Sequence, residues 1–256
     1  MSPGYILKSS YGNDSVALIQ WAKEHRLENV TVLYSDTGWA SAEWPQRVTA
    51  GEVLCQLYGF KTITVKSMGF KELVRQKKSF PRQGIQFCTE ELKVLPAQAA
   101  MDRIDLERKL TVLVGKRREE SANRALTPEF VLYSPLDQGR RLWHPLFDTK
   151  EDERNVLIAK TGMQVLGHRS MECFPCVNSN RADLRKLTPA RIEEIAEFEV
   201  EMGHTGKGKP RTMFRPYRYM GATGIREVVR WAESSPGKFD LDDGTGQDCY
   251  SGVCGI

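Results

Sequence analysis

Near the start of the sequence, Tyr5-Ile6-Leu7-Lys8-Ser9-Ser10-Tyr11-Gly12-Asn13-Asp14-Ser15-Val16 leads from a short apolar run through small polar residues into a segment of helical pattern. The loop 9–15 is therefore expected at the carboxyl end of a strand, the edge of a parallel sheet at which ligands bind. Small residues let the backbone approach a phosphate, and hydroxyl groups and helix N-terminal amides donate hydrogen bonds to its oxygens. The alternative is an ordinary polar turn, and the spacing alone leaves both interpretations open.

Three more β-branched runs follow along the chain, separated by segments of helical composition, at Val30–Tyr34, Thr62–Val65 and Leu110–Val114. This alternation predicts an α/β domain over residues 1–165, with a parallel sheet and helices on both faces. Residues 166–256 change character and are expected to form a smaller, mostly helical C-terminal region. Thr188-Pro189 is typical of a helix start there, and a second helix is expected from Thr223, with an apolar face of Ile225, Val228, Val229 and Ala232.

The composition is that of a globular protein, because 40% of the 256 residues are hydrophobic and 27% are charged. No apolar run approaches the ~20 residues of a membrane span, and residues 1–10 lack the pattern of a signal peptide. We therefore expect a cytoplasmic protein with no membrane partner. The net charge of +4 is compatible with a small anionic ligand and with nucleic acid, and it favours neither.

The loop is similar to the pyrophosphate-binding loop of the PP-loop ATPases, Ser-Gly-Gly-x-Asp-Ser, at Ser10, Gly12, Asp14 and Ser15. Tyr11 replaces the first glycine, and PAPS reductases also carry an aromatic residue there, in a Ser-Ser-Phe-Gly version. Further motifs in the family's order extend the resemblance over residues 5–180: Asp36-Thr37-Gly38, Cys88-Thr89-x-x-Leu92-Lys93-x-x-Pro96, Gly115-x-Arg117-x-x-Glu120-Ser121-x-x-Arg124 and Trp143-His144-Pro145-Leu146. The chain thus resembles the PAPS reductase family, which implies an adenine nucleotide alpha hydrolase-like fold.

The resemblance implies roles for the polar residues of these motifs. ATP, or alternatively PAPS or APS, is expected on Ser9, Ser10, Gly12, Asn13, Asp14, Ser15, Asp36, Thr37, Gly38, Arg118, Glu120 and Ser121. Asp14 is also expected to help position Mg²⁺, whose preferred ligands are oxygens. The expected catalytic residues are Asp14, Lys93, Arg117, Arg124 and Cys254. Arginines just beyond a strand suit phosphate and sulfate oxygens, and the alternative is a solvated helix face on which Glu119 and Glu120 pair with them.

The motif Cys173-Phe174-Pro175-Cys176 is a CxxC, which is used in thiol redox, zinc and iron–sulfur sites. Its spacing from the last two cysteines favours a zinc site of Cys173, Cys176, Cys249 and Cys254. Resemblance to the ATP-hydrolysing component of DNA phosphorothioation favours a [4Fe–4S] cluster instead. We expect the cluster on Cys88, Cys173, Cys176 and Cys249, with Zn²⁺ as the alternative and Cys254 as a second choice for the fourth ligand.

Cys254 would then remain as a thiol close to the end of the sequence. PAPS reductases use a cysteine in a Glu-Cys-Gly-Leu-His segment to attack sulfur, whereas Val253-Cys254-Gly255 lacks the glutamate and the histidine. The equally simple interpretation is that Cys254 is a metal ligand or has no role. Cys55 lies in an apolar helical stretch and is expected to be part of the core.

Residues 207–231 interleave basic and aromatic side chains: Lys207, Lys209, Arg211, Phe214, Arg215, Tyr217, Arg218, Tyr219, Arg226, Arg230 and Trp231. Such a mixture suits a nucleic-acid backbone and unstacked bases. The alternative is that the aromatic rings pack a small helical domain while the arginines are solvated.

Three functions remain open from the sequence. The first is an enzyme that cleaves ATP to AMP and pyrophosphate while adenylating an acceptor, in a sulfur-related or nucleic-acid modification reaction. The second is a PAPS or APS reductase that releases sulfite with a thioredoxin-like reductant. The third is a subunit that binds nucleotide or nucleic acid without catalysis. The expected partners are an adenine nucleotide, a sulfur donor or reductant and nucleic acid, and an oligomer is compatible with all three.

Overall fold

The computed structural model describes residues 4–214 and 223–234, which divide into two compact units. Of the described residues, the sheet unit comprises 4–69 and 89–174, and the helical unit comprises 70–88, 175–214 and 223–234. The chain passes from one unit to the other after Gly69, after Cys88 and after Phe174. Each unit is therefore assembled from segments that are distant in the sequence.

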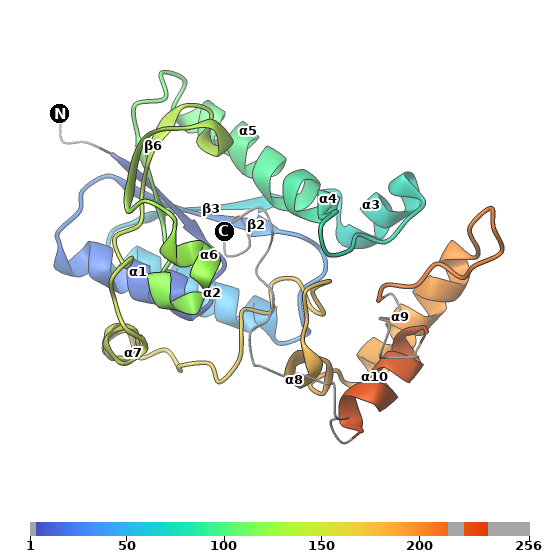
Figure 1. The fold of residues 1–256 in the computed structure, drawn as a ribbon. Coiled ribbons are helices and arrows are strands. Elements are labelled where there is room, and N and C mark those ends of the chain that lie inside the picture. Colours follow the sequence, from blue (N-terminus) through green and yellow to red (C-terminus); the bar gives the residue numbers. More distant parts are fainter. Residues whose placement is uncertain (1–3, 215–222, 235–256) are drawn as a thin grey trace. The chain divides into compact units, whose positions relative to one another are not determined.

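The sheet unit contains a six-stranded sheet with the order β3-β2-β1-β4-β6-β5 (Figure 1). Neighbouring strands are parallel except β5 and β6, which are antiparallel. The expected α/β fold is confirmed, and the apolar runs of the sequence are the first strands of the sheet. The strands are β1 (Tyr5–Ser9), β2 (Val30–Asp36), β3 (Lys61–Lys66), β4 (Thr111–Val114), β5 (Phe130–Ser134) and β6 (Arg140–Trp143).

The edge hairpin of β5 and β6 is not anticipated by the sequence pattern. β5 contains the apolar run 130–133, of which Leu132 and Tyr133 are exposed, but β6 begins with Arg140 and Arg141, so the second strand of the hairpin does not read as an apolar run. The reversal between them follows the short helix Pro135–Asp137, with Gln138 at a φ of 57° and Gly139 at a φ of 87°. A polar turn of this kind fixes an edge strand without an apolar signature.

Helices cover both faces of the sheet (Figure 1), and alternate residues of the central strands pack against the two helical layers. On one face, Leu7, Val32 and Leu113 pack with α1 (Asn13–Glu24) and α2 (Trp44–Leu57), and α7 (Glu151–Lys160) joins this layer through Ile158. On the other face, Ile6, Leu33 and Val112 pack against α5 (Leu95–Ile104). Burial on both faces explains why the strands are continuous apolar runs rather than alternating ones.

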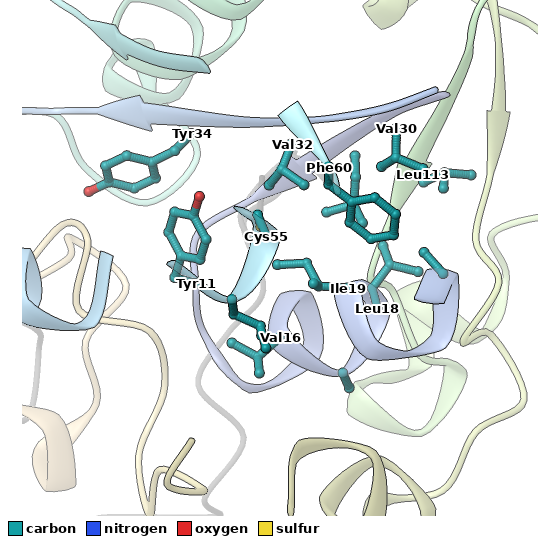
Figure 2. Packing of buried hydrophobic residues seen from close by; sticks show 14 of the residues in the cluster. Tyr11, Val16, Leu18, Ile19, Val30, Val32, Tyr34, Cys55, Phe60 and Leu113 are labelled. Atoms are coloured by element: carbon teal, nitrogen blue, oxygen red, sulfur yellow. The ribbon is translucent and has the colours of Figure 1, made fainter. Parts of the chain in front are cut away.

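A cluster of buried side chains lies directly beneath the loop that follows β1, and Figure 2 shows its arrangement. The rings of Tyr11 and Tyr34 are 5.6 Å apart, and Val16 and Cys55 belong to the same cluster. Cys55 is fully buried, which confirms its expected place in the core. Burial raises the pKa of the Cys55 thiol to about 12.

Several short helical segments follow α3 (Phe70–Lys77) and β4 along the sequence. They are α4 (Phe87–Thr89), a π-helical turn (Glu90–Val94) that leads into α5, a 3₁₀ turn (Arg118–Glu120) and α6 (Ala122–Ala125). The π-helical turn holds Lys93 in a buried position. The 3₁₀ turn and α6 carry the arginines that follow β4.

The helical unit contains α3 (Phe70–Lys77), α8 (Arg181–Leu184), α9 (Pro189–Met202) and α10 (Ile225–Glu233). The Thr188 hydroxyl accepts the amide hydrogen of Arg191 at 3.2 Å, so the expected helix start is confirmed. The expected apolar face of α10 is buried, and Phe80 packs edge-on against Phe198 with ring centroids 5.3 Å apart. Within the described ranges every helix is too short or too polar to span a lipid bilayer.

Candidate active site

The strand order of the sheet creates a position at which two loops meet. β1 lies between β2 and β4, because the chain first runs outward from β1 through β2 to β3 and then crosses over to β4 on the other side of β1. At such a point the loops beyond the carboxyl ends of adjacent strands diverge and leave room for a ligand. The loop after β1 is 10–12, which leads into the first turn of α1 at residues 13–15, and the loop after β4 begins at Gly115. A Cβ on Gly115 would lie 2.8 Å from the carbonyl oxygen of Asp14, so the two loops are in close contact.

Buried hydroxyl groups line the loop after β1. Ser10 Oγ lies 3.2 Å from Ser15 Oγ and accepts the amide hydrogen of Gly12, also at 3.2 Å. Ser9 Oγ accepts the amide hydrogen of Tyr11 at 3.0 Å. The first intrahelical bond of α1 runs from Val16 N–H to Gly12 O, so the preceding amides have no acceptor within the helix. Hydroxyls and helical amides together form a cradle suited to an anion.

Tyr11 replaces the glycine of the loop motif and shows why a glycine is usual there. Its φ is 57°, in the left-handed region that favours glycine, and its ring is fully buried beneath the loop. A Cβ on Gly51 of α2 would lie 2.1 Å from Tyr11 Cδ1, so Gly51 makes the space for the ring. Arg47, also of α2, donates to the Tyr11 carbonyl at 2.7 Å. The aromatic departure is therefore matched by specific residues of α2.

Asn13, expected to contact the nucleotide, uses its side-chain amide within the protein. Its Nδ2 donates to Leu166 O at 2.9 Å, and its Oδ1 accepts from Leu166 N at 2.9 Å. This two-way bond joins the start of α1 to the segment after α7. The Asn13 side chain thus fixes the position of the loop from the outside.

Asp14 lies at the centre of a charged network at the N-terminus of α1. Its Oδ1 accepts from Arg117 Nε at 2.6 Å and lies 3.7 Å from Arg154 Nη1. Burial acts against the charge of Arg117, but Asp14 and Glu119 together raise its pKa. Two guanidinium groups thus surround this carboxylate, and the expected role of Asp14 in positioning Mg²⁺ stays a prediction.

The arginines after β4 differ in their surroundings. Arg117 has a buried side chain, whereas Arg118 is exposed, pairs with Asp148 at 2.6 Å and stacks over Phe147. Glu120 pairs with Arg124 and also accepts the Arg117 amide hydrogen at 2.9 Å. The Ser121 hydroxyl accepts the Arg124 amide hydrogen at 3.2 Å as the cap of α6. Glu120, and Glu119 through its ion pair with Arg117, thus fix the positions of the arginines.

The loop after β2 carries the Asp36-Thr37-Gly38 motif. Asp36 Oδ1 accepts the Gly38 amide hydrogen at 2.9 Å, and Gly38 has a φ of 62°. Thr37 is fully buried, and its hydroxyl donates to the backbone oxygen of Glu172 at 2.8 Å. Thr37 therefore holds this turn against a segment 135 positions later in the sequence.

That segment adds two site residues that sequence reasoning missed, Ser170 and Glu172. Glu172 Oε1 accepts from Lys93 Nζ at 2.8 Å, and both side chains are more than nine-tenths buried. Burial opposes ionisation of Glu172, but Lys93 and the Ser170 hydroxyl hold its pKa below its usual range. A Cβ on Gly12 would lie 2.9 Å from Ser170 Cβ, so Ser170 adjoins the cradle. No local pattern marks this pair, because its partners are distant in the sequence.

The geometry agrees with a comparison at the level of the sequence. The family model described as "Phosphoadenosine phosphosulfate reductase domain" matches residues 4–179. The chain belongs to this family. No protein among those with curated functions has a matching sequence. The matched residues 4–179 include all the loops described above.

Several solved structures resemble the chain at low identity. PAPS reductase from Candida auris has a TM-score of 0.45 and 15% identity, over 64% of this chain and 75% of that one. NMN synthetase from Francisella tularensis has a TM-score of 0.47 and 12% identity, over 90% of this chain and 84% of that one. The U34-tRNA thiolase NcsA from Methanococcus maripaludis, solved with its [4Fe-4S] cluster, has a TM-score of 0.47 and 15% identity, over 89% of this chain and 80% of that one.

The expected metal ligands are described only in part. Cys88, Cys173 and Cys176 are half-buried thiols outside any disulfide, and Cys249 and Cys254 lie outside the described residues. Cys173 belongs to a short parallel bridge with Trp39, and the Phe174 amide donates to Trp39 O at 2.8 Å. Among the described residues, no three His, Cys, Asp or Glu side chains gather as in a metal site.

The basic, aromatic segment contributes several contacts inside the helical unit. Phe214 is buried, and Arg181 lies 4.6 Å above the Trp231 ring. Arg211 Nη1 donates to Met202 O at 3.0 Å, and Arg226 pairs with Glu193 at 2.5 Å. These contacts use part of the segment for packing. Arg215, Tyr217, Arg218 and Tyr219 lie outside the described residues, and nucleic-acid binding stays a prediction.

Proposed function

We propose that the protein binds ATP at the loop after β1 and cleaves it between the α and β phosphates. An acceptor oxygen forms a bond to the α phosphorus, the bond to the bridging oxygen breaks, and pyrophosphate leaves with the electron pair. The products are an adenylated acceptor, or AMP after its release, and pyrophosphate. The observation that supports this most strongly is the cradle of Ser10 and Ser15 at the N-terminus of α1, beside buried Arg117.

The residues divide the work by position. Ser10, Gly12 and Ser15 would hold the leaving pyrophosphate, whose charge suits the hydroxyls and helical amides. Arg117 and Lys93, with Arg124, would stabilise the charge that develops in the transition state. Residues 36–38 would border the nucleoside, and Arg118, Glu120 and Ser121 would complete the wall after β4. Catalysis in such a site consists mainly of positioning and charge stabilisation.

The acceptor belongs to sulfur metabolism or to nucleic-acid modification in this proposal, as the family resemblance implies. Membership of the PAPS reductase family supports a second candidate, in which PAPS or APS occupies the same cradle and a thiol releases sulfite. Cys254 would supply that thiol, with a thioredoxin-like protein as reductant. A subunit that binds nucleotide without turnover is the third candidate, and all three share the anion cradle.

For the iron–sulfur cluster we propose Cys88, Cys173, Cys176 and Cys249 as ligands, with Zn²⁺ as the alternative metal. The three described thiols are partly accessible, and accessible cysteine thiolates are the ligands of such clusters. Such a cluster would supply electron transfer or a site for binding sulfur. Counting iron, zinc and acid-labile sulfide after anaerobic purification decides between the metals, since ~4 irons per chain indicate [4Fe–4S].

The test of the nucleotide site is calorimetric binding of ATP and of PAPS to the anaerobically purified protein, followed by assays for pyrophosphate and sulfite release. Wild-type protein should bind ATP, and Ser15→Ala should weaken binding by about tenfold, since one charge-assisted hydrogen bond is lost. Arg108→Ala is the matched control, because Arg108 is a half-exposed arginine that pairs with Asp102 just before β4. It should change nothing.

Each outcome assigns one candidate. Pyrophosphate release supports adenylation, thioredoxin-dependent sulfite release that disappears in Cys254→Ser supports the reductase, and tight binding without either product supports the binding subunit. Wild-type protein that binds neither nucleotide would refute the whole proposal. Ser15→Ala protein with unchanged affinity would refute the assignment of the cradle.

A further inference from the structure

A buried ion pair outside the expected nucleotide-binding set connects three walls of the site. Lys93 Nζ donates to Glu172 Oε1 at 2.8 Å, and the other carboxylate oxygen of Glu172 accepts from the Ser170 hydroxyl. Ser170 Cβ adjoins Gly12 in the anion cradle, at 2.9 Å from the position of a Cβ on that glycine. The contacts run in series from the loop after β1 to Lys93.

The backbone of the same segment is fixed from the opposite side. The Thr37 hydroxyl donates to Glu172 O at 2.8 Å, and Ser41 N donates to Met171 O at 3.0 Å. The Ser35 hydroxyl donates to the carbonyl oxygen of Lys93 at 3.4 Å. Glu172 is therefore held at its backbone by the loop after β2 and at its carboxylate by Ser170, so its side chain has a fixed direction.

We propose that Glu172 is a positioning residue, which directs the Lys93 ammonium group toward the phosphates of a nucleotide in the cradle. Lysine is a flexible point-charge donor that needs a fixed partner to define its position. Glu172 provides that partner from within the site, and Ser170 fixes the carboxylate in turn. This inference rests on the proposed nucleotide site. Glu172 directly precedes the CxxC motif, and the role that we assign to it does not depend on a metal.

The test is a double-mutant cycle on the affinity for ATP, measured by calorimetry with wild type, Lys93→Met, Glu172→Gln and the double variant. Lys93→Met should weaken ATP binding by ~10-fold or more, because a charge-assisted contact to phosphate is lost. Glu172→Gln should produce a loss of similar size. The double variant should bind no more weakly than Lys93→Met alone, since Glu172 acts through the lysine.

A second probe separates positioning from general damage. Pyrophosphate and ATP should both bind Glu172→Gln more weakly, whereas adenosine, which lacks phosphates, should bind it as it binds wild type. Glu24→Gln is the matched control, because Glu24 accepts from Lys160 at 2.8 Å in a half-exposed pair of the same unit. Its affinities should equal those of wild type.

Ser170→Ala keeps both charges and guards against a Glu172 variant that does not fold. It should weaken ATP binding a few-fold in the wild-type background and have no effect in the Lys93→Met background. Losses that multiply in the double variants, an equal loss for adenosine, or unchanged or tighter ATP binding by Glu172→Gln and Ser170→Ala would each overturn the inference. If wild-type protein binds no nucleotide, the proposed function fails first, and the two failures are distinguished.

Discussion

Replacing Tyr11 by the glycine of the PP-loop ATPase motif is predicted to destabilise this protein. Loss of a fully buried aromatic ring costs ~3–5 kcal/mol, and relief of the left-handed backbone at Tyr11 returns ~1–2 kcal/mol. Glycine also adds ~0.5–1 kcal/mol of conformational entropy to the unfolded chain. Tyr11→Gly should therefore lower the free energy of unfolding by about 3 kcal/mol, although it improves the match to the loop motif.

Gly51 gives a second test, because the effect of Gly51→Ala on the free energy of unfolding should change sign when the Tyr11 ring is removed. In wild type, Gly51→Ala places a Cβ 2.1 Å from Tyr11 Cδ1, and such overpacking costs ~1–3 kcal/mol. Without the ring, the same substitution only replaces glycine inside helix α2 and should stabilise by ~1 kcal/mol. The effect of Gly51→Ala is thus expected to reverse between the two backgrounds.

Urea denaturation followed by tryptophan fluorescence and far-UV circular dichroism measures all four members of this cycle. Tyr11→Phe is the control, since it keeps the ring and should stay within ~1 kcal/mol of wild type. A Tyr11→Gly variant as stable as wild type would refute the reasoning. So would a Gly51→Ala penalty that is the same with and without the ring.

Three further predictions concern other buried groups. Lys8 Nζ lies 2.5 Å from Asp137 Oδ1, so Asp137→Asn leaves the buried ammonium without its counter-charge and should lower the free energy of unfolding by ~3–5 kcal/mol. The double variant Lys8→Met/Asp137→Leu removes both charges and should lower it less, as urea denaturation would show. Burial lowers the pKa of His144 from 6.5, so on acidification the unfolded chain binds a proton at this residue before the folded protein does. The contribution of His144 to the free energy of unfolding should therefore be complete above about pH 6.5 and decrease as the pH falls toward the pKa of the folded state. In His144→Gln the free energy of unfolding should fall less steeply with decreasing pH, and equal slopes in wild type and variant would contradict this. Cys55, with its raised pKa, should react with iodoacetamide at pH 8 only after denaturation, as peptide mapping by mass spectrometry would show; rapid labelling of the native protein would disprove it.

The central strands and the anion loop are predictable from the sequence because their causes are local. Strands buried on both faces must be apolar throughout, so Val30–Tyr34 and Leu110–Val114 are visible as runs. The small residues of 9–15 follow from the need for a close backbone approach. The edge hairpin is less evident because β6 opens with two arginines, although residues 130–133 of β5 form an apolar run, of which Leu132 and Tyr133 face solvent in the structure.

The charged partners of the site are not predictable from local patterns. Lys93 and Glu172 are 79 positions apart, and Arg117 reaches Asp14 over 103 positions. Only the fold brings these pairs together, and each is identified by burial and distance rather than by spacing. For the same reason the sequence, which suggests magnesium at Asp14, does not show that Arg117 and Arg154 surround that carboxylate.

The division of the chain into interleaved segments has a consequence for folding during synthesis. Phe80 lies in the first segment of the helical unit, and its ring partner Phe198 leaves the ribosome much later, after the rest of the sheet unit. At ~5–20 residues per second, the 118 positions between them take about 6–24 s to synthesise. During that interval all strands of the sheet can form, while residues 70–88, which lie between the two segments of the sheet unit in the sequence, still lack Phe198 as a packing partner. The newly made chain is thus most vulnerable to chaperone binding and proteolysis at these residues.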